Sequence, residues 1–332
     1  MKKFIFISIL ILTSLNAYEQ DPHFSQYHAS PLTLNPAMTG SMNSDSRFSG
    51  NFRQQWWGVG NPFTTGTISY DTKLIQSKMK KDIFGLGILG MYDQSSDGSF
   101  KNNNLALSLS YHKALDAQAN STLGIGFQLM YASRFINTNK LNFANQFNGY
   151  GFDTDIPSNE TFGNLQRNYF DLNAGLLYTY RNDNVEAYAG GSIYHIGNPN
   201  INFLQNDKYK LPQRYTAHVG SRFFVGNNNE IFFGGLYMYQ AGAQEENLGI
   251  SYGLNVNSAL MVYGGLWYRI QDAFIPFIGL DYKNLSIGFS YDINNSDLKD
   301  YTSKNGSFEV SFIVVTRKPI NPYRNYKKGR VF

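Results

Sequence analysis

The chain has 332 residues, with 28 basic and 24 acidic side chains and no cysteine. The lack of cysteine excludes a disulfide scaffold, thiol catalysis, an iron–sulfur site and a lipoprotein anchor. A mean hydropathy of −0.35 argues against a bundle of transmembrane helices, whose spans need about 20 consecutive apolar residues. These values suit a soluble globular protein. However, aromatic residues reach 16%, and charged residues are also only 16%, against the usual proportion of about 25%.

The first 17 residues have the layout of a secretory signal peptide. Lys2 and Lys3 precede an apolar run at Phe4–Leu12, and the small residue Ala17 marks the expected cleavage site before Tyr18. The apolar run is too short to span a bilayer as a helix. We therefore predict that the protein is exported from the cytoplasm.

Residues 18–46 show no regular alternation of apolar and polar side chains. Pro22, Pro31 and Pro36 disfavour a central strand, because proline has no N–H to donate to a β-ladder. Next to a barrel, such a segment would either plug the lumen or lie on the periplasmic side.

Several stretches within residues 47–316 alternate with a period of two, which is typical of strands with one apolar face. In Leu285–Ile293, for example, the odd-numbered positions are apolar or aromatic and the even-numbered ones are Ser, Gly, Ser and Asp. The pattern predicts fourteen strands, at Arg47–Trp57, Gly66–Leu74, Ile83–Tyr92, Asn104–Ala114, Ser121–Phe135, Tyr169–Arg181, Val185–Ile196, Arg214–Val225, Glu230–Gln240, Asn247–Asn255, Ala259–Ile270, Ala273–Tyr282, Leu285–Ile293 and Ser307–Val315.

Alternation alone does not separate a β-sandwich from a transmembrane barrel, but strand length and aromatic placement favour the barrel. Most predicted strands are about as long as the 9–11 residues that a tilted strand needs to cross a bilayer. Aromatic pairs recur near strand ends, as expected for the two interfacial girdles of a barrel. These pairs are Trp56 and Trp57, Tyr131 and Phe135, Tyr178 and Tyr180, Tyr237 and Tyr239, and Trp267 and Tyr268.

The connections between strands give an independent indication. Those after even-numbered strands are short or of middling length, whereas the long ones, at 136–168, 197–213 and 294–306, follow odd-numbered strands. Barrels of the outer membrane have short periplasmic turns and longer extracellular loops. The sequence therefore predicts an all-β, antiparallel transmembrane barrel of about fourteen strands, with both chain termini in the periplasm.

Residues 317–332 follow the last strand and contain six basic residues and no acidic one. We expect a periplasmic tail that contacts an acidic partner or phospholipid head groups, although a disordered tail without a partner has the same composition. The basic residues of this tail are Arg317, Lys318, Arg324, Lys327, Lys328 and Arg330.

No motif in the chain predicts chemistry. None of the five histidines has the spacing of a zinc-enzyme pair, and the G-x-G-x-x-G at Gly85–Gly90 lies inside a predicted strand rather than before a helix. We therefore expect no catalytic, cofactor-binding or metal-ligating residues, and export makes nucleic acid an implausible partner.

The segment Asp21–Gly40, which reads DPHFSQYHASPLTLNPAMTG, resembles the opening signature of the PorP/SprF family. The likeness continues with FRQQWW at Phe52–Trp57 and SYD at Ser69–Asp71. Ten residues of these motifs are candidates for contacts with a partner or within a plug: Asp21, Pro22, Phe24, Ser25, Gln26, Tyr27, Asn35, Pro36, Arg53 and Trp56.

The resemblance implies an outer-membrane protein of the type IX secretion system and gliding machinery of Bacteroidetes. Members of this family are thought to receive the C-terminal domain of a particular secreted adhesin or enzyme and to retain it at the cell surface. Some are associated with the periplasmic ring of the motor. The same resemblance suggests secreted cargo, other secretion or motor components and outer-membrane lipid as partners.

Two other functions stay open at this level. Fatty-acid transporters of the outer membrane also have fourteen strands and an N-P-A motif in an N-terminal hatch, which Asn35-Pro36-Ala37 resembles. A continuous apolar tunnel would favour such a channel, and a blocked lumen would favour the anchor. A surface enzyme is the third alternative, but nothing specific in the sequence favours it.

Overall fold

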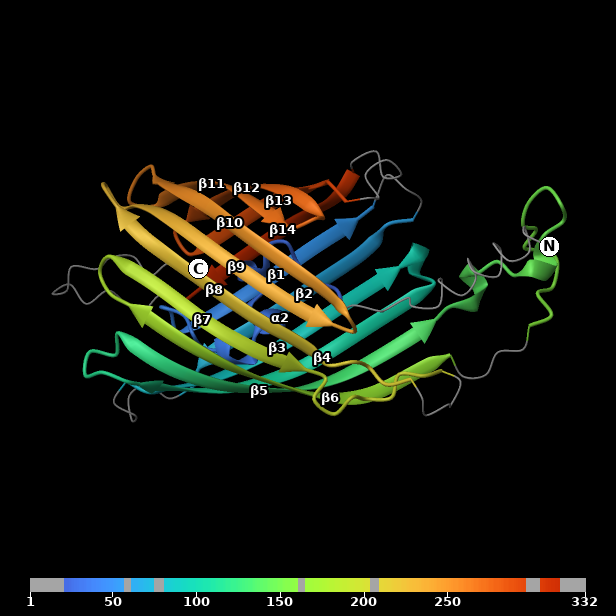
Figure 1. The fold of residues 1–332 in the computed structure, drawn as a ribbon, viewed down its shortest axis with the longest axis horizontal. Coiled ribbons are helices and arrows are strands. Elements are labelled where there is room, and N and C mark those ends of the chain that lie inside the picture. Colours follow the sequence, from blue (N-terminus) through green and yellow to red (C-terminus); the bar gives the residue numbers. More distant parts are fainter. Residues whose placement is uncertain are drawn as a thin grey trace, which may run out of the picture.

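The computed structural model describes residues 21–56, 61–74, 81–160, 165–203, 209–296 and 305–316. Their fourteen antiparallel strands close into one barrel, in which each strand pairs with its sequence neighbours and β1 pairs with β14 (Figure 1). The predicted fold is therefore confirmed. The strands are β1 (Ser46–Gln55), β2 (Phe63–Lys73), β3 (Ile83–Ser95), β4 (Phe100–Ala114), β5 (Ser121–Ile136), β6 (Gln166–Arg181), β7 (Val185–Tyr194), β8 (Arg214–Val225), β9 (Asn229–Gln240), β10 (Ala243–Asn255), β11 (Leu260–Arg269), β12 (Ala273–Tyr282), β13 (Leu285–Asn294) and β14 (Asn305–Val315).

The alternating side chains sort onto the two faces of the wall. On β4, Leu105, Leu107 and Leu109 point outward and are 56%, 48% and 52% exposed, whereas Ser108 and Ser110 point inward and are buried. The low mean hydropathy follows from this arrangement, because half of each strand faces a polar interior. Among the described residues, no helix is long and apolar enough to cross a membrane.

The expected aromatic girdle is only partly present. Tyr131, Phe135, Tyr178 and Tyr237 do lie exposed on the outer face. The assignment of Trp267 to the girdle was wrong, because the register of β11 turns its side chain into the lumen, where it is 2% exposed.

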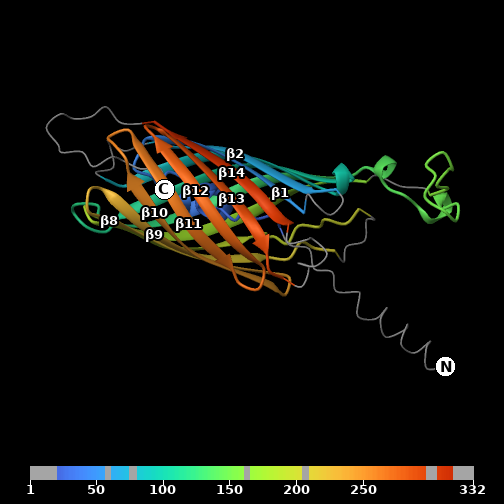
Figure 2. The same ribbon diagram turned by 90° about the horizontal axis from the view of Figure 1, so that it is seen from above.

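The two ends of the barrel differ in their connections. The long connections between β5 and β6 and between β7 and β8 lie at one end, which we call the long-loop end (Figures 1 and 2). Their described parts are residues 137–160, 165, 195–203 and 209–213. Tight hairpins such as the one between β12 and β13 occupy the opposite, short-turn end. β1 starts and β14 ends at the short-turn end, where Arg47 pairs with Val315.

Several strands continue beyond their predicted limits at the long-loop end. β3 runs to Ser95, β4 already begins at Phe100, and β10 begins at Ala243. The alternation fades there because most side chains on both faces are polar, but the backbone pairing of the strands continues. The wall therefore extends above its apolar belt and encloses additional space.

Candidate functional site

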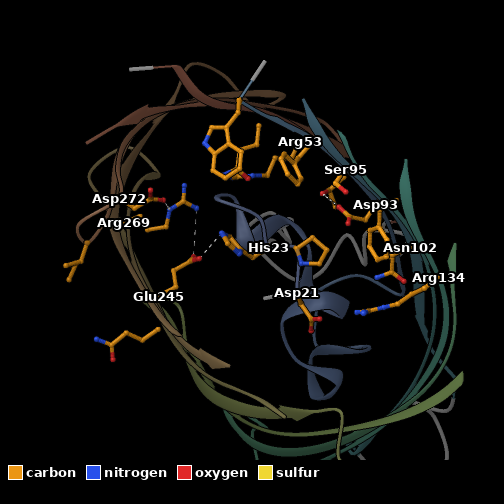
Figure 3. Close-up of a pocket in the computed structure, with 18 residues that line it drawn as sticks. Asp21, His23, Arg53, Asp93, Ser95, Asn102, Arg134, Glu245, Arg269 and Asp272 are labelled. Carbon is orange, nitrogen blue, oxygen red and sulfur yellow. Dashed lines mark hydrogen bonds and ion pairs between the residues drawn. The ribbon is translucent and has the colours of Figure 1, made fainter. Parts of the chain in front are cut away.

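Residues 21–45 lie inside the barrel and form what we call the plug (Figures 1 and 3). The plug contains three short helical turns, η1 (Tyr27–Ala29), α2 (Pro31–Leu34) and η2 (Pro36–Met38). Most of its side chains are buried, and η2 packs against β4, β5 and β6. Residues 21–45 of the segment predicted at 18–46 thus lie inside the lumen, and residues 18–20 lie outside the described residues.

The plug runs through the lumen from one end to the other. Asp21 lies at the long-loop end, beside His195 just after β7 and Gln240 at the end of β9. Asn43 lies at the short-turn end and donates a hydrogen bond to Glu186 at 2.7 Å. The chain then enters β1 at Ser46.

The S-Q pair of the sequence motif is held by a buried group of charges that we call the Arg53 cluster: Ser25, Gln26, Arg53, Asp292 and Glu309. The carboxylate of Glu309 accepts hydrogen bonds from the backbone N–H groups of Ser25 and Gln26, at 2.8 and 3.0 Å. Arg53 forms ion pairs with Asp292 at 3.0 Å and with Glu309 at 3.3 Å, and it also donates to the hydroxyl of Ser25.

The geometry of the Arg53 cluster explains why these residue types occur together. A carboxylate that accepts two backbone N–H groups fixes the plug at a point where the plug backbone has no helix or strand partner. Arg53 then compensates the buried charges of the two acids. Arg269 on β11 pairs with Asp292 from the opposite side, so the cluster ties the plug to β1, β11, β13 and β14.

The N-P-A motif docks on the opposite wall. The Asn35 side chain accepts a hydrogen bond from Ala37 N–H at 2.8 Å and so caps η2. Its amide nitrogen donates to the carbonyl oxygens of Leu176 at 2.9 Å and Gly191 at 3.2 Å. Asn35 is completely buried, so water cannot reach its side chain. These bonds to the protein satisfy its polar atoms instead.

Inward-facing glycines make room for this docking. A Cβ atom on Gly175 would overlap the Asn35 side chain, and one on Gly126 would overlap the backbone of Pro36 and Ala37. Here the missing side chains let the plug backbone approach the wall.

A third group, the His195 cluster, holds the beginning of the plug: Asp21, Asp171, His195 and Arg214. The imidazole of His195 lies between two carboxylates, 2.6 Å from Asp21 and 2.8 Å from Asp171. Burial lowers the pKa of His195, but the two carboxylates outweigh it and raise the pKa to about 9. The imidazolium is therefore the stable form at neutral pH, and Arg214 adds a second cation 3.2 Å from Asp21.

An aromatic stack fills the space between the Arg53 cluster and the short-turn end. His28 stacks on Trp267 with ring centroids 5.2 Å apart, and Tyr27 meets the same indole edge-on at 5.6 Å. Leu32 and Phe24 are also buried. The contacts of Trp267 with His28 and Tyr27 give it a role inside the lumen that the girdle prediction missed.

Near the short-turn end, Arg47 and Asp71 hold the last part of the plug. Arg47 pairs with Asp71 at 2.9 Å, and Asp71 accepts a hydrogen bond from Gly40 N–H at 2.8 Å. Asp71 belongs to the SYD motif, so a sequence signal for it existed, but it was not among the candidate residues. Asp292, Glu309 and His195 were also missed, because inward polar residues look alike in an alternating strand.

Above the plug, the long-loop end opens into a cavity of about 530 Å³, which we call the vestibule (Figure 3). Asp21, Pro22 and His23 of the plug form part of its lining. Its walls combine charged, amide and aromatic side chains, including Arg53, Trp56, Phe63, Asp93, Phe100, Asn102, Arg134, Glu245, Arg269 and Asp272. Two further cavities between plug and wall measure only about 50 and 40 Å³.

The structure brings the motif candidates together on or beside the plug. Phe24, Ser25, Gln26, Tyr27, Asn35 and Pro36 are buried plug residues, Arg53 faces them from β1, and Asp21, Pro22 and Trp56 line the vestibule. The six basic tail residues, Arg317 to Arg330, lie outside the described residues. In the described part of the chain, no three His, Asp or Glu side chains gather in a way that could hold a metal ion.

The sequence model of one protein family, described as the type IX secretion system membrane protein PorP/SprF, matches residues 16–314. The chain belongs to the PorP/SprF family. The match spans the plug and all but the last residue of the barrel, so the family describes both parts. The protein is accordingly an outer-membrane barrel of the type IX secretion family.

Comparison with solved structures finds other barrels. The CymD monoaromatic hydrocarbon channel is 9% identical, with a TM-score of 0.49 over 87% of this chain and 93% of that chain. A Pseudomonas aeruginosa FadL homologue is 12% identical, with a TM-score of 0.48 over 85% of this chain and 92% of that chain. Likenesses this distant carry no argument about ligands for this PorP/SprF barrel. No curated protein matches the sequence.

Proposed function

We propose that this barrel is a non-enzymatic receptor of the type IX secretion system, which takes up the C-terminal domain of a secreted adhesin or enzyme and anchors it at the cell surface. Membership of the PorP/SprF family supports a role in type IX secretion. The single structural observation that supports anchoring over transport is the plug, which fills the lumen between the Arg53 cluster and the wall opposite it.

The proposed orientation puts the long loops outside the cell and the short turns in the periplasm. The signal peptide at residues 1–17 would be removed on export. The basic tail at 317–332 would follow β14 into the periplasm, where it could meet other secretion or motor components. The vestibule and the loops 137–165 and 195–213 would then face the arriving cargo.

A channel for hydrophobic small molecules is a weaker alternative. It would require the plug to leave the lumen, and that would break the buried charge contacts of the Arg53 and His195 clusters. The small cavities beside the plug do not offer an apolar path of ligand size.

Capture of cargo tests the proposal. An affinity tag in the 182–184 hairpin, at the short-turn end, would leave the long loops intact during a pull-down from gently solubilised outer membranes. We expect recovery of a large secreted protein through its C-terminal domain, and loss of that recovery when residues 141–158 of the β5–β6 loop are deleted. Cargo that stays fixed to the surface of cells lacking the barrel would reject anchoring. Uptake of a hydrophobic compound by liposomes that hold the intact barrel would favour the channel.

A further inference from the structure

We propose that the outer end of the β5–β6 loop is a preformed docking surface, and that its occupant is an apolar pocket with a basic border on the C-terminal domain of the secreted cargo. We call residues 143–158 the aromatic tip, and they lie within the stretch 137–160 that the structure describes. The cargo as occupant rests on the proposed function, whereas the tip as a binding surface rests on its own geometry.

The aromatic tip stands away from the wall of the barrel. The loop leaves β5 after Ile136, and two short turns follow, η4 (Thr138–Lys140) and η5 (Ala144–Gln146). In two views at right angles, the green segment that contains the tip extends beyond the long-loop end, along the long direction of the molecule (Figures 1 and 2). The tip is therefore separate from the outward apolar side chains of the strands and lies where a partner can reach it.

Hydrogen bonds within the tip fix its shape. The side chain of Gln146, which is only 7% exposed, accepts a hydrogen bond from the N–H of Phe143 and donates one to the carbonyl oxygen of Ile156, both at 3.0 Å. The N–H of Asp153 donates to the carbonyl oxygen of Gln146 at 2.8 Å. A surface that is ordered before binding loses less conformational entropy when a partner docks.

A tight turn at the end of the tip presents three aromatic rings. Phe147 and Phe152 form an antiparallel bridge, and their rings meet edge to face with centroids 5.4 Å apart. Between them, the side chain of Asn148 accepts hydrogen bonds from the N–H groups of Tyr150 and Gly151, both at 3.0 Å. The backbone that carries the third ring is therefore held in place as well.

These rings are exposed although they are ordered. Phe147 and Phe152 are 53% and 54% exposed, and Tyr150 is 101% exposed, so its ring packs on nothing in the described part of the chain. An exposed apolar patch with a polar border typically marks an interaction site, and aromatic rings are frequent among the residues that dominate binding energy. The three rings are thus the anchors that a docked partner would cover.

The charge of the tip determines which partner fits. Residues 141–160 contain Asp153, Asp155 and Glu160 but no Lys or Arg. These carboxylates would repel the phosphates of a lipid surface, and a second copy of the tip would bring the same charges against them. A protein pocket with an apolar floor and a basic border complements the rings and the carboxylates together.

The first test measures how long the cargo stays on the full-length barrel. The complex is immobilised through the tag in the 182–184 hairpin, and the secreted protein that remains is quantified by mass spectrometry during a wash. Tyr150→Ala should release it about 10- to 30-fold faster, because loss of an anchoring ring acts mainly on the dissociation rate. Tyr150→Phe keeps the ring and should stay close to the wild-type rate. Tyr209→Ala is the matched control, since Tyr209 is 70% exposed in the β7–β8 loop.

The outcomes separate the tip from the proposed function. A wild-type barrel that recovers no secreted protein through its C-terminal domain rejects the proposed function, and the cargo as occupant with it. Recovery with equal release rates for the wild type and Tyr150→Ala leaves anchoring intact and refutes the tip. Equal acceleration by Tyr209→Ala refutes it too, because the effect would then not be specific to the three rings.

The second test identifies what the tip touches, with a photoreactive amino acid in place of Tyr150. Irradiation of intact cells should join it to the C-terminal domain of the same secreted protein. The same amino acid in place of Gln118, which is exposed in the β4–β5 turn at the short-turn end, should not form this adduct. Adducts of position 150 with a second barrel, or with a lipid or glycan of the cell surface, would overturn the choice of occupant.

The third test addresses the basic border. Raising NaCl from about 50 to about 300 mM should speed release from the wild-type barrel, because salt screens exposed charge pairs. Asp155→Asn should reduce this salt dependence, since Asp155 is one of the exposed carboxylates. Release from the wild type that does not change with salt would refute a partner with a basic border.

Discussion

The guanidinium of Arg53 on β1 lies 3.0 Å from the carboxylate of Asp292 on β13, although β14 runs between these two strands. The Ser25 hydroxyl of the plug donates to the same carboxylate at 2.9 Å. One plug residue thus completes an ion pair of the wall, so folding of the barrel and seating of the plug are energetically coupled.

Glu309→Ala tests this coupling. The substitution would leave the N–H groups of Ser25 and Gln26 and part of the Arg53 charge buried without their acceptor. Removing one partner of a buried charge pair typically costs 3–5 kcal/mol, and because Asp292 still pairs with Arg53 we expect a loss of about 3 kcal/mol. The free energy of unfolding by urea in detergent micelles measures this loss. Glu160→Ala, in an exposed loop, should change it little, and equal effects of the two variants would contradict the coupling.

Gly175→Ala should displace the N-P-A turn. The added methyl group overlaps the Asn35 side chain, and overpacking of this kind usually costs about 1–3 kcal/mol. Gly264→Ala is the matched control, because Gly264 also lies in a strand but a Cβ there meets nothing within 4 Å. Trypsin cleavage within the plug should accelerate in the first variant only. Equal cleavage rates would mean that the plug does not depend on this close approach.

The fold was more predictable from the sequence than the site was. Lipid tolerates only apolar side chains over a continuous belt, so the alternation of apolar and polar residues indicates which side chains face lipid. The number of strands and most strand limits follow from this pattern. The predicted strand limits were wrong where the wall rises above the belt, as at Phe100 and Ala243, because no lipid there requires an apolar outer face.

The interior had a different kind of signal. The resemblance to a family motif identified Asp21, Ser25, Gln26 and Arg53. The alternation of apolar and polar residues did not. Their partners Asp292, Glu309 and His195 occupy positions where any polar residue satisfies the pattern. Contacts such as Ser25 to Glu309 join residues 284 positions apart, and only the closed register of β1 with β14 brings them together.

The His195 cluster predicts a pH dependence. The pKa of His195 is raised from an unfolded value of 6.5 to about 9, because Asp21 and Asp171 outweigh the effect of burial. A raised pKa contributes stability that is fully present below pH 6.5 and is lost as the pH rises through 9. We expect the free energy of unfolding to fall by about 3 kcal/mol between pH 6 and pH 9.5.

Urea titrations at both pH values measure this change. His195→Asn is a suitable control, since asparagine tolerates the positive φ of 59° at this position and has no charge to lose. At pH 6, the free energy of unfolding of this variant should be lower than that of the wild type. Between pH 6 and pH 9.5 it should change little. If the free energy of unfolding of the wild type also stays constant over this pH interval, the imidazolium does not hold Asp21.

Leu107→Arg tests the membrane belt. Leu107 points outward near the middle of β4, between Ile88 and Leu129 on the neighbouring strands. An arginine on the lipid face at the bilayer midplane costs about 2–4 kcal/mol, so less barrel should reach the heat-modifiable folded form in outer membranes. Tyr150→Arg introduces the same side chain in the β5–β6 loop, where Tyr150 is fully exposed, and should assemble normally. Normal assembly of both variants would be incompatible with a lipid-facing β4, because the cost of the charge depends on the medium that surrounds it.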